Sequence, residues 1–354
     1  MSGIKRNSPK QDSKTDKSKK SKSNMVPEKV ICTHSGSFHA DEALAVYMIK
    51  LLPEYSNSKL IRSRKTEDWE KADIIVDVCG VYDETQHKYD HHQRTFQEYF
   101  DKEKKTTTKL SSAGLIYKHF GKRIIQLLLS HANEDEKMLD VLYNKIYDDF
   151  IESVDANDNG VSAYPSSIEP GFKNGLLTLP GVISSMNPNW NHPDQSDAHF
   201  DKCFLEASKF IGDIFVRYVK NLGESWYPAK TIVEESINNR FTVDPERGAI
   251  IKFTQFVPWK EHLHAIEKEL GIENQIKFVL FPDNSGSWRV STVTISPGSF
   301  EFRLGLPTEW RGLRDDELSA KSAIPNCVFV HAAGFIGGNK TEEGALKMAQ
   351  ASFL

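Results

Sequence analysis

Cysteine is scarce in this sequence of 354 residues: the four cysteines lie far apart and form no CxxC pair. This scarcity argues against a disulfide framework and against a thiolate zinc site, and it is typical of a reducing compartment. No run of 18 or more apolar residues is present, so we expect no transmembrane helix and no membrane partner. No internal repeat is visible either, and the length suggests two domains, or three at most.

Residues 1–24 have almost no apolar side chains and cannot bury enough surface to fold, so we predict a disordered basic tail over 1–25. They contain eight Lys or Arg and two Asp, which leaves a formal charge of −10 on the rest of a chain whose total is −4. The tail lacks the apolar segment of a secretory signal, and it is Lys-rich where transit peptides are Arg-rich. A nuclear address or an arm that contacts nucleic acid fits it best, with a solvated tail as the plain alternative.

Strand and helix patterns alternate after the tail. Strands are expected at residues 29–34, 59–65 and 72–80. Helices are expected at residues 41–53, at 111–129 with a break at Gly121, and at 138–154, where apolar residues recur at every fourth position. This alternation predicts an α/β domain with a parallel sheet over residues 26–195.

The second half of the chain has a different pattern. Residues 159–196 are rich in Gly, Pro, Ser and Asn and predict an irregular segment, and residues 196–225 predict one long linker helix. Beyond it we expect strands within 241–256, 276–283 and 287–296 and a helix at 260–271. We therefore predict a smaller α+β domain at 226–354.

Histidine and acidic side chains gather after two of the predicted strands. His34, His39 and Asp41 follow the first strand, at the edge where open α/β sheets bind ligands, although Asp41 alone is explained as a helix cap. Asp77 ends a predicted buried strand, and burying an unpaired carboxylate costs several kcal/mol. A strand-end aspartate of this kind indicates a hydrogen-bond network, a cation or a metal ion.

Two further positions extend this set. In "YDHHQ", Asp90 stands next to His91 and His92, thirteen residues beyond Asp77, so a loop can return them to the same sheet edge. Asp155 projects from the buried stripe of its predicted helix. Asn157, Asp158, Asn159 and Gly160 are explained as a helix-ending turn.

Carboxylates and imidazoles without thiolates suit Mn²⁺ or Mg²⁺ better than zinc or iron. Six candidate ligands are too many for one catalytic ion and suit two ions bridged by one carboxylate, an arrangement that catalyses displacement at phosphorus. The six candidates are His34, His39, Asp41, Asp77, His91 and Asp155.

Five segments together resemble the melanocyte proliferating gene protein family, a eukaryotic group of DHH-like 3′–5′ RNA exonucleases of nucleus and mitochondria within the DHH phosphoesterase superfamily. They are "THSGSFHADEALA", "DVCGVYD", "YDHHQ", "LPTEWRGLRDDELS" and "FVHAAGFIGGNKTEEGALKMA". The resemblance spans 29–354 and implies a DHH-type catalytic domain, a linker and a substrate-binding domain. It also implies the metal ligands named above, with one departure: His39 stands where the superfamily's first motif has an Asp.

The C-terminal motif predicts a glycine-rich loop that enters a helix with Thr341 as its N-cap. Backbone N–H groups in such a loop can hold a phosphate, and a plain loop-to-helix turn is the alternative; the resemblance favours the substrate loop. The predicted substrate contacts are Arg311, Arg314, Gly337, Gly338, Asn339 and Lys340. The predicted catalytic residues are Asp77, His92, Arg303 and His331, with exposed salt bridges as the alternative for any one arginine.

Together these inferences predict a metal-dependent phosphodiesterase, a 3′–5′ exonuclease in RNA processing with two Mn²⁺ or Mg²⁺ ions and RNA as its partner. A phosphohydrolase of pyrophosphate or small nucleotides is one alternative, and a non-catalytic metal-binding interaction protein is another. The acidic body argues against nucleic acid, because phosphate binding needs clustered Lys and Arg. We expect the protein in the nucleus, the mitochondrion or both, and the cytosol is also compatible.

Overall fold

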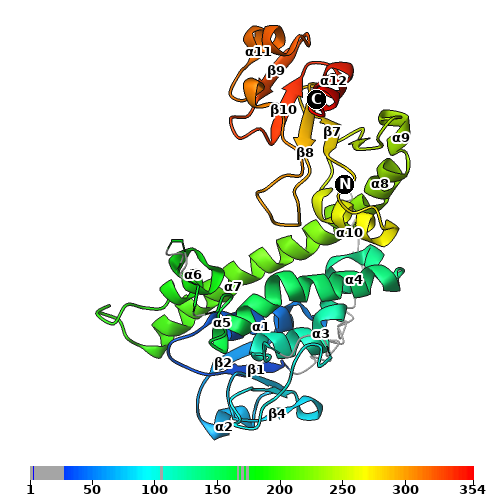
Figure 1. The fold of residues 1–354 in the computed structure, drawn as a ribbon. Helices are drawn as coiled ribbons and strands as arrows, with labels where there is room; N and C mark the ends of the chain where they lie inside the picture. Colours follow the sequence, from blue (N-terminus) through cyan, green and yellow to red (C-terminus); the bar gives the residue numbers. More distant parts are fainter. Residues whose placement is uncertain (1–2, 4–27, 104–106, 166, 169–170, 173–174) are drawn as a thin grey trace.

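The computed structural model describes residues 3, 28–103, 107–165, 167–168, 171–172 and 175–354. Two mixed sheets lie at opposite ends of the molecule, and the long helix α7 runs between them (Figure 1). This arrangement confirms the α/β class. The predicted disorder of the tail falls, but for residue 3, outside the described residues and stays a prediction.

The first sheet has the strand order β2-β1-β3-β5-β4. Its strands are β1 (Val30–Thr33), β2 (Lys59–Arg62), β3 (Ile74–Val76), β4 (Tyr82–Asp83) and β5 (Lys88–Tyr89). β1 is parallel to β2 and β3, and β3 is parallel to β5, whereas β4 pairs antiparallel with β5 at the edge. The predicted parallel sheet is therefore a mixed one, because a short hairpin reverses the chain between β4 and β5.

The helices of this first region include a buried α1, which contacts both α3 and α7. They are α1 (Ala40–Leu51), α2 (Thr66–Trp69), α3 (Ser112–Leu128), α4 (Glu136–Ile146), α5 (Glu152–Asp158) and α6 (Leu179–Ser185). The predicted break at Gly121 is wrong, since α3 continues through it. A side chain at Gly121 would collide with the rings of Tyr117 and Tyr143, so the glycine serves close packing. α6 lies in the segment that was predicted to be irregular.

α7 (Asp197–Asn221) does not end where the sequence predicts. It continues through a π-helical turn, Leu222–Trp226, into α8 (Tyr227–Asn238). Pro228 does not stop the run because it stands in the first turn of α8, where its missing N–H costs least. The π-helical turn is the junction between the two regions.

The second sheet has the order β6-β7-β8-β10-β9, with β6 parallel to β7 and the other neighbours antiparallel. Its strands are β6 (Ile250–Lys252), β7 (Phe278–Pro282), β8 (Trp288–Thr292), β9 (Cys327–Val330) and β10 (Ile336–Asn339). The remaining helices are α9 (Arg240–Val243), α10 (Lys260–Leu270), α11 (Asp315–Ser322) and α12 (Glu342–Ala351). Of the strand expected within 241–256, only β6 forms, because Arg240–Val243 is helical.

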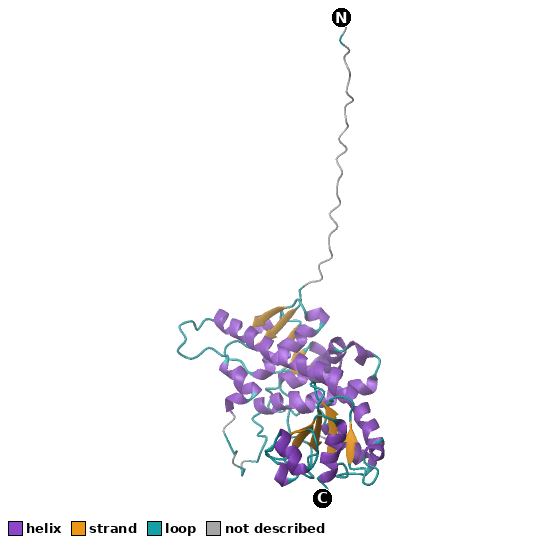
Figure 2. Cartoon of the chain, turned by 90° about the horizontal axis from the view of Figure 1, so that it is seen from above, coloured by secondary structure: helices purple, strands orange, loops and turns teal. Residues whose placement is uncertain are grey.

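The two regions have separate hydrophobic cores. In the first region the core runs from Ile31 to Leu222, and in the second it begins at Ala229. Alternate residues of β7 face two different cores: Val279 packs with α8 and α10, and Leu280 packs with α11 and α12. Helices and strands are thus gathered in two clusters (Figure 2). Within the described part of the chain, no helix is both long and apolar enough to cross a membrane. The predicted domain boundaries stay predictions.

Candidate metal centre

Three parallel strands end at the same edge of the first sheet, and each is followed by a predicted site residue. His34 follows β1, Asp77 follows β3, and His91 and His92 follow β5 after one aspartate. Because the carboxyl ends of parallel strands share an edge, residues far apart in the sequence meet there. His39 joins them as the N-cap residue of α1.

The backbone at Asp77 is strained. Its φ is +56°, in the left-handed region that non-glycine residues rarely adopt, and Cys79 follows with a φ of +90°. Such conformations cost about 1–3 kcal/mol and are found mostly at functional sites. The sharp turn aims the Asp77 carboxylate between two histidines: Oδ2 lies 3.4 Å from His34 Nε2, and Oδ1 lies 3.3 Å from His91 Nε2.

In the described part of the chain, three groups of donor atoms lie close enough together to hold cations. The groups are His34, His39, Glu42 and Asp77; Asp77, His91 and His92; and His39, Asp41 and Asp158. Within each group the ligand atoms lie within 4.8 Å of one another. Asp77 and His39 each belong to two groups, so the clusters are contiguous.

Several buried atoms of these clusters lack hydrogen-bond partners. They include Asp41 Oδ1, Asp77 Oδ1 and His91 Nε2, the last of which lies near two carboxylates but without hydrogen-bond alignment. An unsatisfied buried polar atom is costly, and a bound cation satisfies the two carboxylate oxygens. Carboxylates with imidazoles also suit divalent cations. The residues therefore fit a divalent metal.

The pKa shifts within the cluster also fit a bound cation. Burial raises the pKa of Asp41 well above its usual range, and Asp77 and Asp158 add repulsion. Burial lowers the pKa of His34, but Asp77 and Glu42 outweigh it and raise that pKa to about 10. At His91, burial is likewise outweighed by Asp158 and Asp77, and the pKa rises to about 10. Protons on these histidines thus offset negative charge until a cation displaces them.

Adjacent His91 and His92 differ in their surroundings. His91 is mostly buried and lies 3.1 Å, through Nε2, from Asp158 Oδ2. The His92 side chain is 61% exposed, and its Nδ1 donates to Asp90 Oδ1 at 2.7 Å. Asp90 also accepts from the backbone N–H of His92 and from that of Gly80. The buried Asp90 therefore orients His92 and leaves its Nε2 to the surface.

Asp155 is not part of the cluster, so the predicted ligand role does not fit the structure. Its buried Oδ1 accepts from Ser111 N–H at 3.0 Å, from Ser111 Oγ at 2.7 Å and from Gly114 N–H at 3.0 Å, while Oδ2 accepts from Tyr147 at 3.0 Å. Although burial raises the pKa of Asp155 to about 7, its four donors favour the carboxylate. It caps the N-terminus of α3.

Asp158 occupies the position that was assigned to Asp155. It lies three residues further on α5, on the same helix face, and reaches His91. The sequence analysis assigned Asp158 to a helix-ending turn. The signal that could have found it is this three-residue spacing between the two aspartates.

Glu42 is a second side chain to which the sequence analysis gave no role. Both of its carboxylate oxygens accept from His39 N–H, at 2.9 and 3.0 Å, and Oε1 lies 2.9 Å from His34 Nε2. It is fully buried. The adjacent Asp41 accepts from Ser112 Oγ at 2.7 Å. Hydrogen bonds therefore hold both His39 and Asp41, at the start of α1, in place.

Arg303 does not fit the predicted catalytic role. Its buried guanidinium donates to Glu267 Oε1 at 2.8 Å and to the carbonyls of Ile276 and Thr294. A fourth contact joins it to His264 Nδ1 at 3.0 Å. With its donors engaged in this way, Arg303 braces the second region and has none to offer a phosphate.

The predicted glycine-rich loop is also different in the structure. Gly337, Gly338 and Asn339 are buried residues of β10, and Asn339 accepts from the N–H and hydroxyl of Thr341. The N-cap at Thr341 is confirmed, because its hydroxyl accepts from Gly344 N–H at 3.0 Å. Strand pairing with β8 and β9 occupies this backbone, so it cannot wrap a phosphate as a loop would.

The other predicted residues of the second region lie near the surface. Arg314, His331 and Lys340 are exposed, and Arg311 donates through Nε to Leu306 O at 3.1 Å. Among the residues that the structure describes, no hydrogen bond or ion pair joins any of them to the metal cluster.

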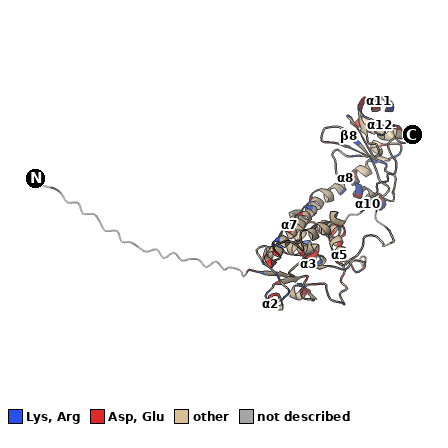
Figure 3. Cartoon of the chain, turned by 90° about the vertical axis from the view of Figure 1, so that its left-hand side faces the viewer, with Lys and Arg blue, Asp and Glu red and all other residues tan. Residues whose placement is uncertain are grey.

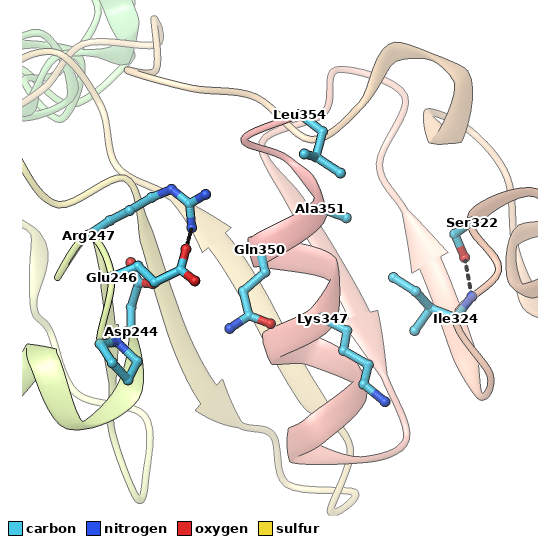
Figure 4. A pocket seen from close by; sticks show the side chains of 10 residues that line it. Asp244, Glu246, Arg247, Ser322, Ile324, Lys347, Gln350, Ala351 and Leu354 are labelled. Atoms are coloured by element: carbon cyan, nitrogen blue, oxygen red, sulfur yellow. Dashed lines mark hydrogen bonds and ion pairs between the residues drawn. The ribbon is translucent and has the colours of Figure 1, made fainter.

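Two hollows differ in their relation to the site. One of about 290 Å³ opens beside the cluster and is lined by Arg64, Trp69, Cys79, Asp77 and His92, among others. Another of about 600 Å³ lies in the second region along α12 (Figure 4). Its charged lining includes the Glu246–Arg247 ion pair and no cluster residue. Only the first hollow gives access to the candidate ligands.

Comparison with known proteins yields one family. Residues 30–353 match the family model MYG1_exonuc, described as "Uncharacterised protein family (UPF0160)". A MYG1 protein of Saccharomyces cerevisiae is 54% identical over 338 residues, which cover 94% of this chain and 98% of the relative. The MYG1 exonuclease of Homo sapiens is 45% identical over 338 residues, covering 94% and 88%. The MYG1 protein of Dictyostelium discoideum is 50% identical over 319 residues, covering 90% and 94%.

Proposed function

The chain belongs to the MYG1 exonuclease family, and we propose that it is a metal-dependent 3′–5′ exonuclease that acts on RNA. The observation that carries this proposal is the cluster at the strand ends, where buried atoms of Asp41, Asp77 and His91 lack hydrogen-bond partners. A metal-dependent phosphodiesterase needs such a set of carboxylates and imidazoles.

We assign two cation positions to the cluster. His34, His39 and Asp77 would hold one ion and Asp77 and His91 the other, with Asp77 shared; Asp41 and Asp158, which form a donor group with His39, would complete the set. Mn²⁺ or Mg²⁺ at these positions would lower the pKa of water and neutralise charge at the phosphorus. Glu42 and Ser112 would keep the ligands of α1 in place through their hydrogen bonds.

His92 would act on the substrate directly. Asp90 accepts from His92 Nδ1–H, so the exposed Nε2 can donate to a phosphate oxygen only when the ring is protonated. Asp90 raises the pKa of His92, which favours that protonated form. The aspartate thus has the role usual for a carboxylate behind a functional imidazole.

The second region would supply further phosphate contacts. Arg311, Arg314, His331 and Lys340 are the proposed partners, brought to the cluster when the two regions close on a strand. Lys and Arg are intermixed with Asp and Glu on the helices (Figure 3). General electrostatic attraction would therefore be weak, and a few local cations would have to position the RNA.

The test is degradation of end-labelled single-stranded RNA, single-stranded DNA and pyrophosphate with Mn²⁺, Mg²⁺ or a chelator. We expect single-nucleotide steps from the 3′ end of RNA, dependent on metal. Turnover of pyrophosphate alone would favour the small phosphohydrolase. Metal binding without any turnover would favour the interaction protein.

We also propose that residues 1–24 direct the protein to the nucleus or the mitochondrion. Their deletion should change cellular distribution, seen by microscopy, without changing metal dependence. An unchanged distribution would leave the segment without an address function.

A further inference from the structure

The loop between α6 and α7 is fastened to the metal centre by one side chain. Asn187 Oδ1 accepts from Phe38 N–H at 2.9 Å, and Asn187 Nδ2 donates to Phe38 O at 2.8 Å. Phe38 immediately precedes His39, a candidate ligand. The paired amide thus ties this loop to backbone that carries the cluster, although the two residues are 149 positions apart.

The same loop is also held together internally. Gln195 donates through Nε2 to the carbonyls of Asn189 and His192, each at 2.9 Å. The ring of His192 stacks on that of His199, with centroids 4.3 Å apart and planes 12° apart. Asp194 Oδ1 accepts from Ser196 N–H at the start of α7. These contacts give the loop one defined conformation.

This ordered loop presents an unpartnered indole. The side chain of Trp190 is 91% exposed, and within the described chain it makes no hydrogen bond and no ring contact. Tryptophan is highly buried on average, and leaving its apolar surface in water forgoes about 25 cal/mol per Å². Trp190 stands three positions beyond Asn187, so its Cα lies within about 11 Å of the Cα of that anchor.

We propose that Trp190 is a platform on which a nucleobase of a single-stranded substrate stacks while the strand's end lies in the metal centre. Every base has a π face, so stacking on an indole tolerates any sequence, as a processive nuclease requires. Because the loop is already ordered, stacking costs little conformational entropy. This inference rests on the proposed nuclease function and adds a substrate contact outside the predicted second-region contacts.

The experiment compares Trp190→Ala and Trp190→Phe with the wild-type protein on single-stranded RNA. The matched substrate is the same strand with its 3′-terminal nucleotides lacking bases. For Trp190→Ala we expect KM on normal RNA to rise about 5- to 150-fold, the range of one lost base stack, with kcat unchanged. Trp190→Phe should recover most of the affinity, and all proteins should have the same KM on the abasic strand.

The control variant is Phe256→Ala, which removes another exposed aromatic side chain from the second region. It should leave KM unchanged on both strands. Metal content and oligomeric mass should be the same in all variants.

Three results would overturn the proposal: an unchanged KM in Trp190→Ala, an equal rise on the abasic strand, or a change in oligomeric mass, which would make the indole a contact between copies. RNA binding, measured by fluorescence anisotropy with a chelator present, tests this proposal separately from the nuclease function. If the wild-type protein cleaves nothing, weaker binding of RNA by Trp190→Ala still supports stacking, and equal binding refutes it.

Discussion

The two regions of the molecule bury charge in opposite ways. In the second region, Glu267 meets Arg303 at 2.7 Å, and the guanidinium also reaches two carbonyls and a histidine. In the first region, Asp41, Glu42, Asp77 and Asp158 crowd one sheet edge, where the described residues place histidines, and no Lys or Arg, within ion-pair distance.

This difference separates two meanings of a buried charge. A carboxylate paired with a guanidinium holds elements of the fold together, and breaking such a pair is costly. A cluster with excess negative charge, unpartnered atoms and strained backbone at Asp77 is a poor way to stabilise a fold. It is typical of a site that a ligand completes.

The largest expected effect comes from Asp77→Asn, which removes the ligand shared by two donor groups. We expect no measurable turnover and loss of most bound metal, checked by elemental analysis and the RNA assay. Asp73→Asn is the control, because Asp73 opens the same sequence run but accepts from Val30 N–H at the other end of the strand. If Asp77→Asn kept its full metal content and activity, the first region would not differ from the second by holding a metal site.

Arg303→Ala tests the buried pair of Glu267 and Arg303. The buried Glu267 would lose its partner, and we expect the free energy of unfolding to fall by about 3–5 kcal/mol in urea titrations. Metal content and kcat of the folded protein should be unchanged. Arg314→Ala, at an exposed position, should leave stability unchanged. A loss of kcat at full stability would instead make Arg303 catalytic.

A smaller effect distinguishes the two aspartates of α5. Asp155→Asn should lower the free energy of unfolding by about 1–3 kcal/mol, because an amide nitrogen would face donors that the carboxylate accepts from. It should retain metal. Asp158→Asn should lose metal. Metal analysis and urea unfolding of both variants decide it, and the reverse pattern would restore Asp155 as the ligand.

The smallest effect concerns pH. In the metal-free protein, the pKa of His34 and of His91 rises from 6.5 to about 10, since carboxylates outweigh burial. A raised folded pKa means that this stabilisation is complete below pH 6.5 and is lost as pH rises through 10. With a chelator present, the temperature of thermal unfolding should therefore fall as the pH rises from 6.5 to 10. Added Mn²⁺ should make that temperature depend less on pH. A flat profile with the chelator present would show that the two histidines are not charged.

Several features follow from local sequence because they depend on local physics. The apolar runs at β1 and β3 and the buried stripe of α4 need only the periodicity of a strand or helix. Thr341 caps α12 through a bond to a residue three positions away. Even the meeting of His34, Asp77 and His91 was predictable, since parallel strands end at one edge.

Other features depended on what packs against each residue. Gly337 and Gly338 suggest a loop by composition, yet pairing with two neighbouring strands makes them β10. Arg303 is a plausible phosphate ligand until Glu267 is placed beside it. The exposure of Trp190 has no signature in its own neighbourhood of the chain.

By itself, the sequence determined which residue types could hold a metal and which sheet edge would collect them, because strand direction and side-chain chemistry are local properties. Only the tertiary structure shows that Asp155 and Asp158 face different partners. Both are carboxylates on one face of α5, and they differ in what lies opposite. The N-terminus of α3 supplies three donors to Asp155 and Tyr147 supplies a fourth, whereas His91 lies opposite Asp158. These partners are set by how α5 packs, which the sequence of α5 alone does not fix.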